Sequence, residues 1–153
     1  MTTASKYVPA SVQQWGQAQI SSGGDYFKCR ALLKGQRHAR DCTYIKYEAE
    51  VDFFERQVNR VLVMVKKVFF TELHRIICVN IPANRELHLG EHEQLYLALV
   101  KTCKAEQDEY GFWRYLSLGG FEFIDFSTIR CTVGRIYDRN AWYIVDRSSE
   151  MLR

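Results

Sequence analysis

The chain has 153 residues, of which 47% are hydrophobic, 25% are charged and 14% are aromatic. This is ordinary globular usage for one domain, and only two prolines and nine glycines argue against a collagen-like or low-complexity chain. The unbroken apolar runs are all far shorter than the roughly 20 residues of a transmembrane helix. Composition therefore excludes membrane-spanning helical, fibrous and fully disordered classes, and it does not indicate an enzyme.

Three parts are expected along the chain. Residues 1–24 are predicted to form a weakly structured extension, because proline, serine and glycine interrupt it. Within it, residues 12–20 fit either a helical turn or a strand, and Trp15 is expected to anchor this piece to the body. A single β-rich domain follows over residues 25–149, and residues 150–153 form a tail.

The first element of the domain is predicted to be a short helix over residues 25–40. Phe27, Ala31 and Leu32 are spaced as on one helical face, and the helix is expected to end near Gly35.

Period-two alternation begins after the predicted helix. Over residues 43–51, one face carries Ile45, Tyr47, Ala49 and Val51 while the other carries mostly polar side chains, which is typical of a half-buried strand. Asp138-Arg139-Asn140 is predicted to be a hairpin turn. Further strand-like runs cover residues 60–68, 69–81, 94–104, 121–126, 129–137 and 142–146. Six or seven short strands with polar turns favour a mostly β fold, either a small antiparallel barrel or a sandwich.

Basic residues are concentrated in one part of the sequence. Residues 28–75 hold eleven Lys and Arg against six Asp and Glu, a net charge of +5, whereas the whole chain carries only +3. A basic patch of this kind could neutralise the phosphates of DNA or RNA, although a solvated, partly helical face is the ordinary alternative. The candidate nucleic-acid-binding residues are Lys28, Arg30, Lys34, Arg37 and Arg40.

The five cysteines are widely spaced and form no CxxC pair. This pattern indicates reduced, mostly buried thiols and an intracellular protein. No metal or other cofactor is predicted.

Carboxylates at predicted strand ends raise the alternative of a metal-dependent nuclease. Asp41, Asp52, Asp125 and Asp146 occupy such positions, and a nuclease would use Asp125 and Asp146. Aspartate at a strand end more often caps a turn, so no catalytic residue is assigned.

Aromatic residues offer a third kind of site, a peptide-binding surface that works through cation–π attraction. The candidates are Tyr44, Trp113 and Tyr115, which are expected on an outer face or in a loop together with Tyr110 and Phe112. The alternative is that Trp113 and Tyr115 pack over one end of a barrel.

Several blocks between residues 12 and 149 resemble an accessory region of fungal mobile-element proteins of the Kyakuja–Dileera–Zisupton and CACTA-like types. The blocks are Trp15-Gly16, Gly23-Gly24-Asp25, residues 40–48, Val51-Asp52, residues 69–76, residues 95–100 and residues 124–148. The FYGxLxRI strand of that family corresponds to residues 69–76, where Phe70-Thr71 replaces the Tyr-Gly pair.

The resemblance implies a small SH3-like or bromo-adjacent-homology-like barrel with a short N-terminal extension, as in chromatin- and DNA-associated proteins. It carries no catalytic residues. It implies a non-catalytic interaction domain that follows a transposase-like part, with DNA, RNA, or a chromatin or transposase protein as partner and the nucleus as one possible location. A protein–peptide module and a degenerate remnant without function stay open as alternatives.

Overall fold

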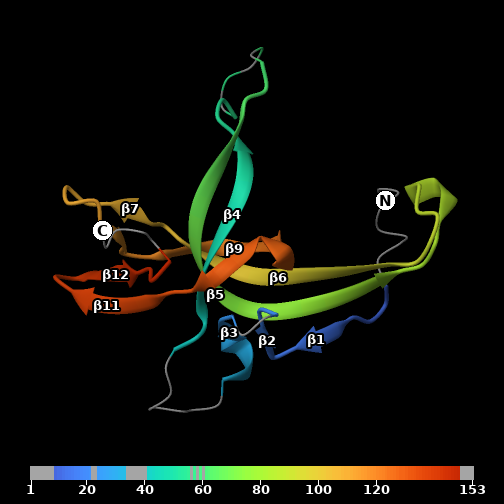
Figure 1. Cartoon of the computed structure of the whole chain (residues 1–153), viewed down its shortest axis with the longest axis horizontal. Helices are drawn as coiled ribbons and strands as arrows, with labels where there is room; N and C mark the ends of the chain where they lie inside the picture. The colour runs from blue at the N-terminus through green and yellow to red at the C-terminus, as the bar shows by residue number, and fades with distance from the viewer. Residues whose placement is uncertain are drawn as a thin grey trace.

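The computed structural model describes residues 9–21, 24–33, 41–55, 57, 59 and 61–148. These residues are mostly strand, as predicted, and the strands pair antiparallel in three sheets (Figure 1). The strands are β1 (Gln13–Trp15), β2 (Gln17–Gln19), β3 (Tyr26–Lys28), β4 (Tyr44–Asp52), β5 (Met64–Ile81), β6 (Glu93–Cys103), β7 (Glu106–Gln107), β8 (Trp113–Tyr115), β9 (Leu118–Asp125), β10 (Ile129–Thr132), β11 (Gly134–Asp138) and β12 (Ala141–Val145). Among the described residues, three 3₁₀ turns join strands: η2 (Arg30–Leu32), η3 (Arg85–Leu87) and η4 (Phe126–Thr128).

The largest sheet is open, so the expected closed barrel is wrong. Its strands follow the order β10-β4-β5-β6-β9, with β1 paired to the far part of β5. Within the described residues the end strands β9 and β10 do not pair with each other, although only η4 separates them in sequence. The second sheet has the order β11-β12-β8-β7, and β2 pairs with β3.

The helix expected over residues 25–40 is also wrong. Phe27 and Cys29 are both fully buried, which is the period-two pattern of an extended chain, and the segment forms β3 followed by η2. The remainder of that prediction, residues 34–40, lies outside the described residues. In the preceding segment, β1 pairs with β5 from Gln13 opposite Cys78 to Trp15 opposite Ile76.

The central strand is β5, which covers 18 residues that the sequence suggested as two runs. It pairs with β4 over its first half and with β6 from Thr71 to its end. A bulge at His74 lies between the pairs Leu73–Val100 and Arg75–Leu99, and it places Glu72 and His74 side by side.

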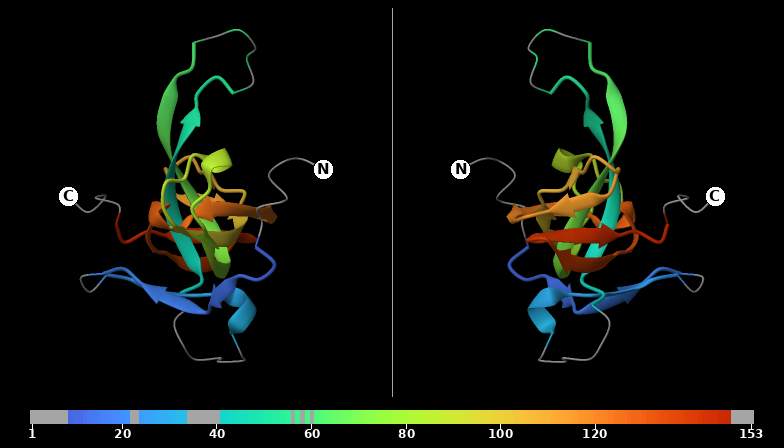
Figure 2. Two further views of the ribbon diagram at one scale, coloured as in Figure 1. Left: turned by 90° about the vertical axis from the view of Figure 1, so that its right-hand side faces the viewer. Right: turned by 90° about the vertical axis from the view of Figure 1, so that its left-hand side faces the viewer.

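The first half of β5 and the second half of β4 form an arm that projects from the body (Figures 1 and 2). Its tip is apolar and exposed: Phe53 is 66% exposed, Val61 83% and Leu62 68%. The backbone N–H of Phe53 donates to the carbonyl of Val63 at 2.8 Å, which holds the two sides of the tip together.

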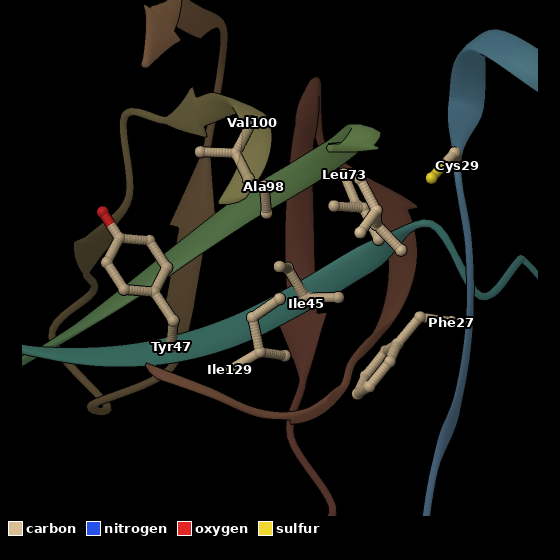
Figure 3. Close-up of a cluster of buried hydrophobic side chains, with 9 residues drawn as sticks. Phe27, Cys29, Ile45, Tyr47, Leu73, Ala98, Val100 and Ile129 are labelled. Carbon is tan, nitrogen blue, oxygen red and sulfur yellow. The ribbon is translucent and has the colours of Figure 1, made fainter. Parts of the chain in front are cut away.

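Two apolar clusters lie on opposite faces of the β4–β5–β6 sheet. The inner cluster includes Phe27, Ile45, Leu73 and Val100, and Tyr47 lies at the end of it far from Phe27 (Figure 3). The outer cluster joins that sheet to the second sheet, and it contains Tyr44, Phe70, Cys103, Tyr115, Val133 and Ile144. Alternate residues of β4 therefore enter different clusters, as the period of two requires.

The strand expected over residues 129–137 is divided in two. At Val133 the chain leaves β10 in the first sheet and enters β11 in the second, and the Val133 N–H donates to the Tyr44 carbonyl at 2.9 Å. The predicted hairpin between β11 and β12 is confirmed, with Asp138 opposite Ala141. Both central residues have positive φ, 48° at Arg139 and 63° at Asn140, as in the turn that suits twisted hairpins.

Candidate functional site

Two of the three candidate peptide-binding aromatics are inside the protein. Tyr44 and Tyr115 are 4% and 3% exposed, and their rings stack at 6.4 Å in the outer cluster. Trp113 is half-buried against Phe70, with ring centres 5.4 Å apart. The expectation that these rings lie on an outer face is therefore wrong for Tyr44 and Tyr115, because the second sheet covers that face of β4.

The guanidinium group of Arg135 occupies the position at these rings where the cation of a bound peptide would have to lie. Its guanidinium carbon lies 3.5 Å from the centre of the Tyr44 ring and 4.2 Å from the centre of the Trp142 ring. The same guanidinium donates to the Tyr115 hydroxyl at 2.7 Å and to Asp41 at 3.2 Å. This cation–π and hydrogen-bond set joins the two sheets and has a structural role.

A second ion-pair system adjoins the first along β5. Glu72 accepts hydrogen bonds from Tyr44 at 2.5 Å and Arg30 at 3.2 Å, and its other oxygen lies 2.6 Å from Nε2 of His74. Arg30 also bonds Asp41 at 3.1 Å, which links both systems. We name these seven residues the polar seam: Arg30, Asp41, Tyr44, Glu72, His74, Tyr115 and Arg135.

The seam stabilises its carboxylates in the charged form. Burial alone would raise the pKa of Glu72, but hydrogen bonds from Tyr44 and His74 and the charge of Arg30 outweigh burial and lower it. Asp41 behaves alike, since bonds from Thr43 and the nearby guanidinium groups outweigh burial and lower its pKa. Glu72 and Asp41 therefore stay ionised near neutral pH, where they stabilise the fold through ion pairs and do not act as proton donors.

The candidate basic patch is only partly described. Lys28 is half-buried in β3 with Nζ 5.8 Å from the Tyr26 ring, and Arg30 is engaged by Asp41 and Glu72. The other three candidates, Lys34, Arg37 and Arg40, lie outside the described residues.

The four strand-end aspartates do not converge on one place. Asp146 is paired with Lys46 at 2.7 Å, and Asp125 accepts from the N–H and hydroxyl of Ser127 at the start of η4. Asp52 accepts from the N–H of Phe54, and Asp41 belongs to the seam. Within the described ranges, no group of three or more His, Cys, Asp and Glu could hold a metal ion.

The cysteine thiols are free, and two of the buried ones, Cys29 and Cys103, resist ionisation. Burial raises the pKa of Cys29 to about 11 and that of Cys103 to about 12. Thiols with such pKa values are almost entirely protonated at neutral pH, so they are poor nucleophiles.

A groove on the inner face of the open sheet is a site that the sequence did not suggest. It extends from the inner cluster toward the arm, between β4 and β9, and has a volume of about 510 Å³. Its charged lining residues are all acidic: Glu55, Glu122 and Asp125. Its remaining lining residues are Tyr47, Ala49, Val51, Phe69, Thr102, Phe123, Ile124 and Thr128. We refer to it as the β4–β9 groove.

Two stacked aromatic rings form part of the groove wall. Tyr47 on β4 and Phe69 on β5 are directly paired in the sheet, and their rings lie 5.0 Å apart at an angle of 15°. A lysine of the arm already lies against this stack, because Nζ of Lys67 is 5.5 Å from the centre of the Phe69 ring. The stack therefore attracts an ammonium group from within the chain itself.

Glu122 is held in position beside this stack. Its Oε1 accepts from the Tyr47 hydroxyl at 3.0 Å and from the Thr102 hydroxyl at 2.9 Å. Both bonds within the described part of the chain fall on the same oxygen, which leaves Oε2 for a further donor. Burial raises the pKa of Tyr47, with the charge of Glu122 adding to the effect, so the tyrosine stays a donor.

The chain matches no model of a known protein family, no curated protein and no solved structure. In the part of the chain that the structure describes, no helix combines the length and the apolar character needed to cross a bilayer.

Proposed function

We propose that this chain is a non-catalytic interaction domain that binds a basic segment of a partner protein in the β4–β9 groove. The observation that carries the proposal is the groove's lining, which combines three carboxylates with a stacked pair of aromatic rings. No Lys, Arg or His is among the lining residues, and Nζ of Lys67 lies 5.5 Å from the Phe69 ring. A lysine or arginine side chain would place its charge near Glu122 and its apolar stem against Phe69, because Tyr47 behind it is only 4% exposed.

The titratable groups elsewhere support a binding role over a catalytic one. Glu72 forms an ion pair with Arg30 and Asp41 forms one with Arg135 inside the polar seam, and Asp146 is paired with Lys46. The ring of Tyr44 is already in contact with the guanidinium of Arg135. These groups stabilise the fold, whereas the carboxylates of the groove face solvent.

Nucleic acid is the second candidate partner, since residues 28–75 carry a net charge of +5. Phosphate contacts would come from Lys28, Lys34, Arg37 and Arg40, while Arg30 would have to leave its two carboxylate partners. A kinship with SH3-like or bromo-adjacent-homology-like domains, an origin in a fungal mobile element and a nuclear location are further proposals that rest on the sequence resemblance.

The test is fluorescence anisotropy of the full chain with a labelled ten-residue peptide of alternating lysine and valine. The matched probes are a glutamate–valine peptide and a labelled DNA duplex, each at two salt concentrations. We expect the basic peptide to bind at low salt and weaken as salt rises, because its affinity depends partly on unscreened charge.

Variants then locate the binding. Glu122→Gln and Glu55→Gln are expected to weaken the peptide about fivefold each, since each removes one attractive charge. The matched control is Glu109→Gln, in the loop between β7 and β8 and not among the groove residues. The absence of peptide binding at low salt, or an equal loss of affinity in all three variants, would overturn the groove as the binding site. Tight binding of the DNA duplex in place of the peptide would favour nucleic acid as the partner.

A further inference from the structure

We infer that the basic segment binds as an additional strand along the open edge of β9, with alternate side chains entering the β4–β9 groove. The inference rests on the proposed function and specifies how the partner is held. It follows from the position of β9 in the sheet, from the two faces of that strand, and from the charges along it.

The edge of β9 offers backbone groups to a partner. β9 is the last strand of the large sheet, and among the described residues it pairs with β6 alone. From Phe121 to Asp125 the pairing with β6 is continuous, which keeps this edge straight and regular. In such a strand, alternate residues direct their N–H and C=O groups away from the sheet, where a new strand can bond them.

This edge lacks the features that usually prevent added pairing. Natural edge strands are often short or carry lysine or proline. β9 has eight residues, Leu118 to Asp125, and contains neither lysine nor proline. By contrast, β10 at the other end of the sheet has only four residues and includes Arg130, which pairs with Glu48.

The two faces of β9 would receive different side chains. On the inner face, Glu122 bonds Tyr47 and Ile124 packs on the inner cluster, so both face the groove side. Phe121 and Phe123 alternate with these two residues and are 56% and 58% exposed, and Phe123 is also one of the residues that line the groove. Because side chains of a strand alternate, an added strand would place every second residue beside Glu122 and the others beside these two phenylalanines.

The partner is therefore an extended segment in which basic and apolar residues alternate. Its lysines or arginines would meet Glu122 in the groove, and its apolar residues would cover Phe121 and Phe123. A second copy of this chain fits less well, because each β9 edge carries the carboxylates of Glu122 and Asp125 and no base. Two such edges would repel each other.

Backbone methylation of the peptide tests this binding mode. In an added strand only every second peptide N–H bonds to β9, so N-methylation of one alternate set should weaken the lysine–valine peptide at least about tenfold. N-methylation of the other set should change its affinity less than about threefold. The two methylated peptides have the same composition and the same number of methyl groups, so each is the control for the other.

A second peptide tests the alternating pattern. A peptide of the same composition in the order KKVVKKVVKV should bind about five times more weakly, since four of its ten side chains fall on the wrong face. If the unmodified peptide binds but both methylated sets bind alike, the added strand is wrong while the groove proposal stands. If the unmodified peptide does not bind, both proposals fail, and a shift of the free protein to a dimer lost in Phe123→Asp would assign the β9 edge to a second copy instead.

Discussion

The guanidinium of Arg135 lies between the rings of Tyr44 and Trp142, at 3.5 Å and 4.2 Å from their centres. Tyr44 belongs to the large sheet and Trp142 to the second sheet, so one side chain from β11 connects both layers. Its hydrogen bonds to Tyr115 and Asp41 fix the plane of the guanidinium between the rings.

This relationship predicts that Arg135→Ala lowers the free energy of unfolding by about 2 kcal/mol, because Asp41 and Tyr115 each lose one hydrogen bond and two rings lose their cation. Arg135→Lys should recover less than half of the loss, since an ammonium cannot stack flat or donate in a fork. Urea denaturation followed by tryptophan fluorescence measures both. A lysine variant as stable as the parent would contradict the role of guanidinium geometry.

Stability should fall in acid. The pKa values of Asp41, Glu72 and Asp146 all lie below the ordinary range, so these carboxylates bind fewer protons in the folded chain than in the unfolded one. Their contribution is complete above about pH 6 and is lost as the pH falls below about 4, through the lowered pKa values. Urea midpoints between pH 7 and pH 3 measure this.

One variant identifies the group responsible for the acid effect. Glu72→Gln should be less stable than the parent at pH 7 and lose less stability between pH 6 and pH 3, because its amide does not titrate. A urea midpoint of the parent that stays constant over that interval would refute the ion-pair role of the polar seam.

The inner cluster predicts a large and local cost for truncation. Leu73 is fully buried, so Leu73→Ala should lower the free energy of unfolding by about 3 kcal/mol through lost burial and a residual cavity. The matched control is Leu62→Ala at the arm tip, where the side chain is 68% exposed and the change should stay within about 0.5 kcal/mol. Equal effects in thermal unfolding would mean that the arm tip is packed in solution.

The hairpin between β11 and β12 depends on positive φ at Asn140. Asn140→Val should lower the free energy of unfolding by about 1 kcal/mol or more, since a β-branched residue is strained at a φ of 63°. Asn140→Gly should be as stable as the parent, because glycine adopts that φ without strain. Chemical denaturation measures the stability of both variants. A valine variant as stable as the glycine variant would exclude the positive φ at Asn140.

The sequence predicts the strands in which apolar and polar side chains alternate clearly. In β4, Ile45 and Tyr47 face the inner cluster as their period of two indicates. Alternation did not reveal that a second sheet covers the opposite face, so Tyr44 was expected outside. Between residues 25 and 40, the spacing of Phe27, Ala31 and Leu32 is typical of a helix, but the burial of Phe27 and Cys29 follows the pattern of an extended chain.

The groove could not be predicted because its parts come from distant segments. Tyr47 and Phe69 meet through the register of β4 against β5, and Glu122 lies 75 residues after Tyr47 in the sequence. Single-sequence patterns locate strands but do not give their order in the sheet. The break at Val133 was hidden for the same reason, since both halves of residues 129–137 are strands and only the sheet assignment separates them.

The exposed apolar run at the arm tip has a consequence for the solubility of the protein. Val61, Leu62, Val63 and Met64 are consecutive, exposed and uncharged, and such β-prone runs promote association of partly unfolded chains. Lys66 and Lys67 follow two residues later and supply the like-charge repulsion that keeps neighbouring copies apart. Two lysines on a projecting arm are therefore expected to oppose association of copies through this run.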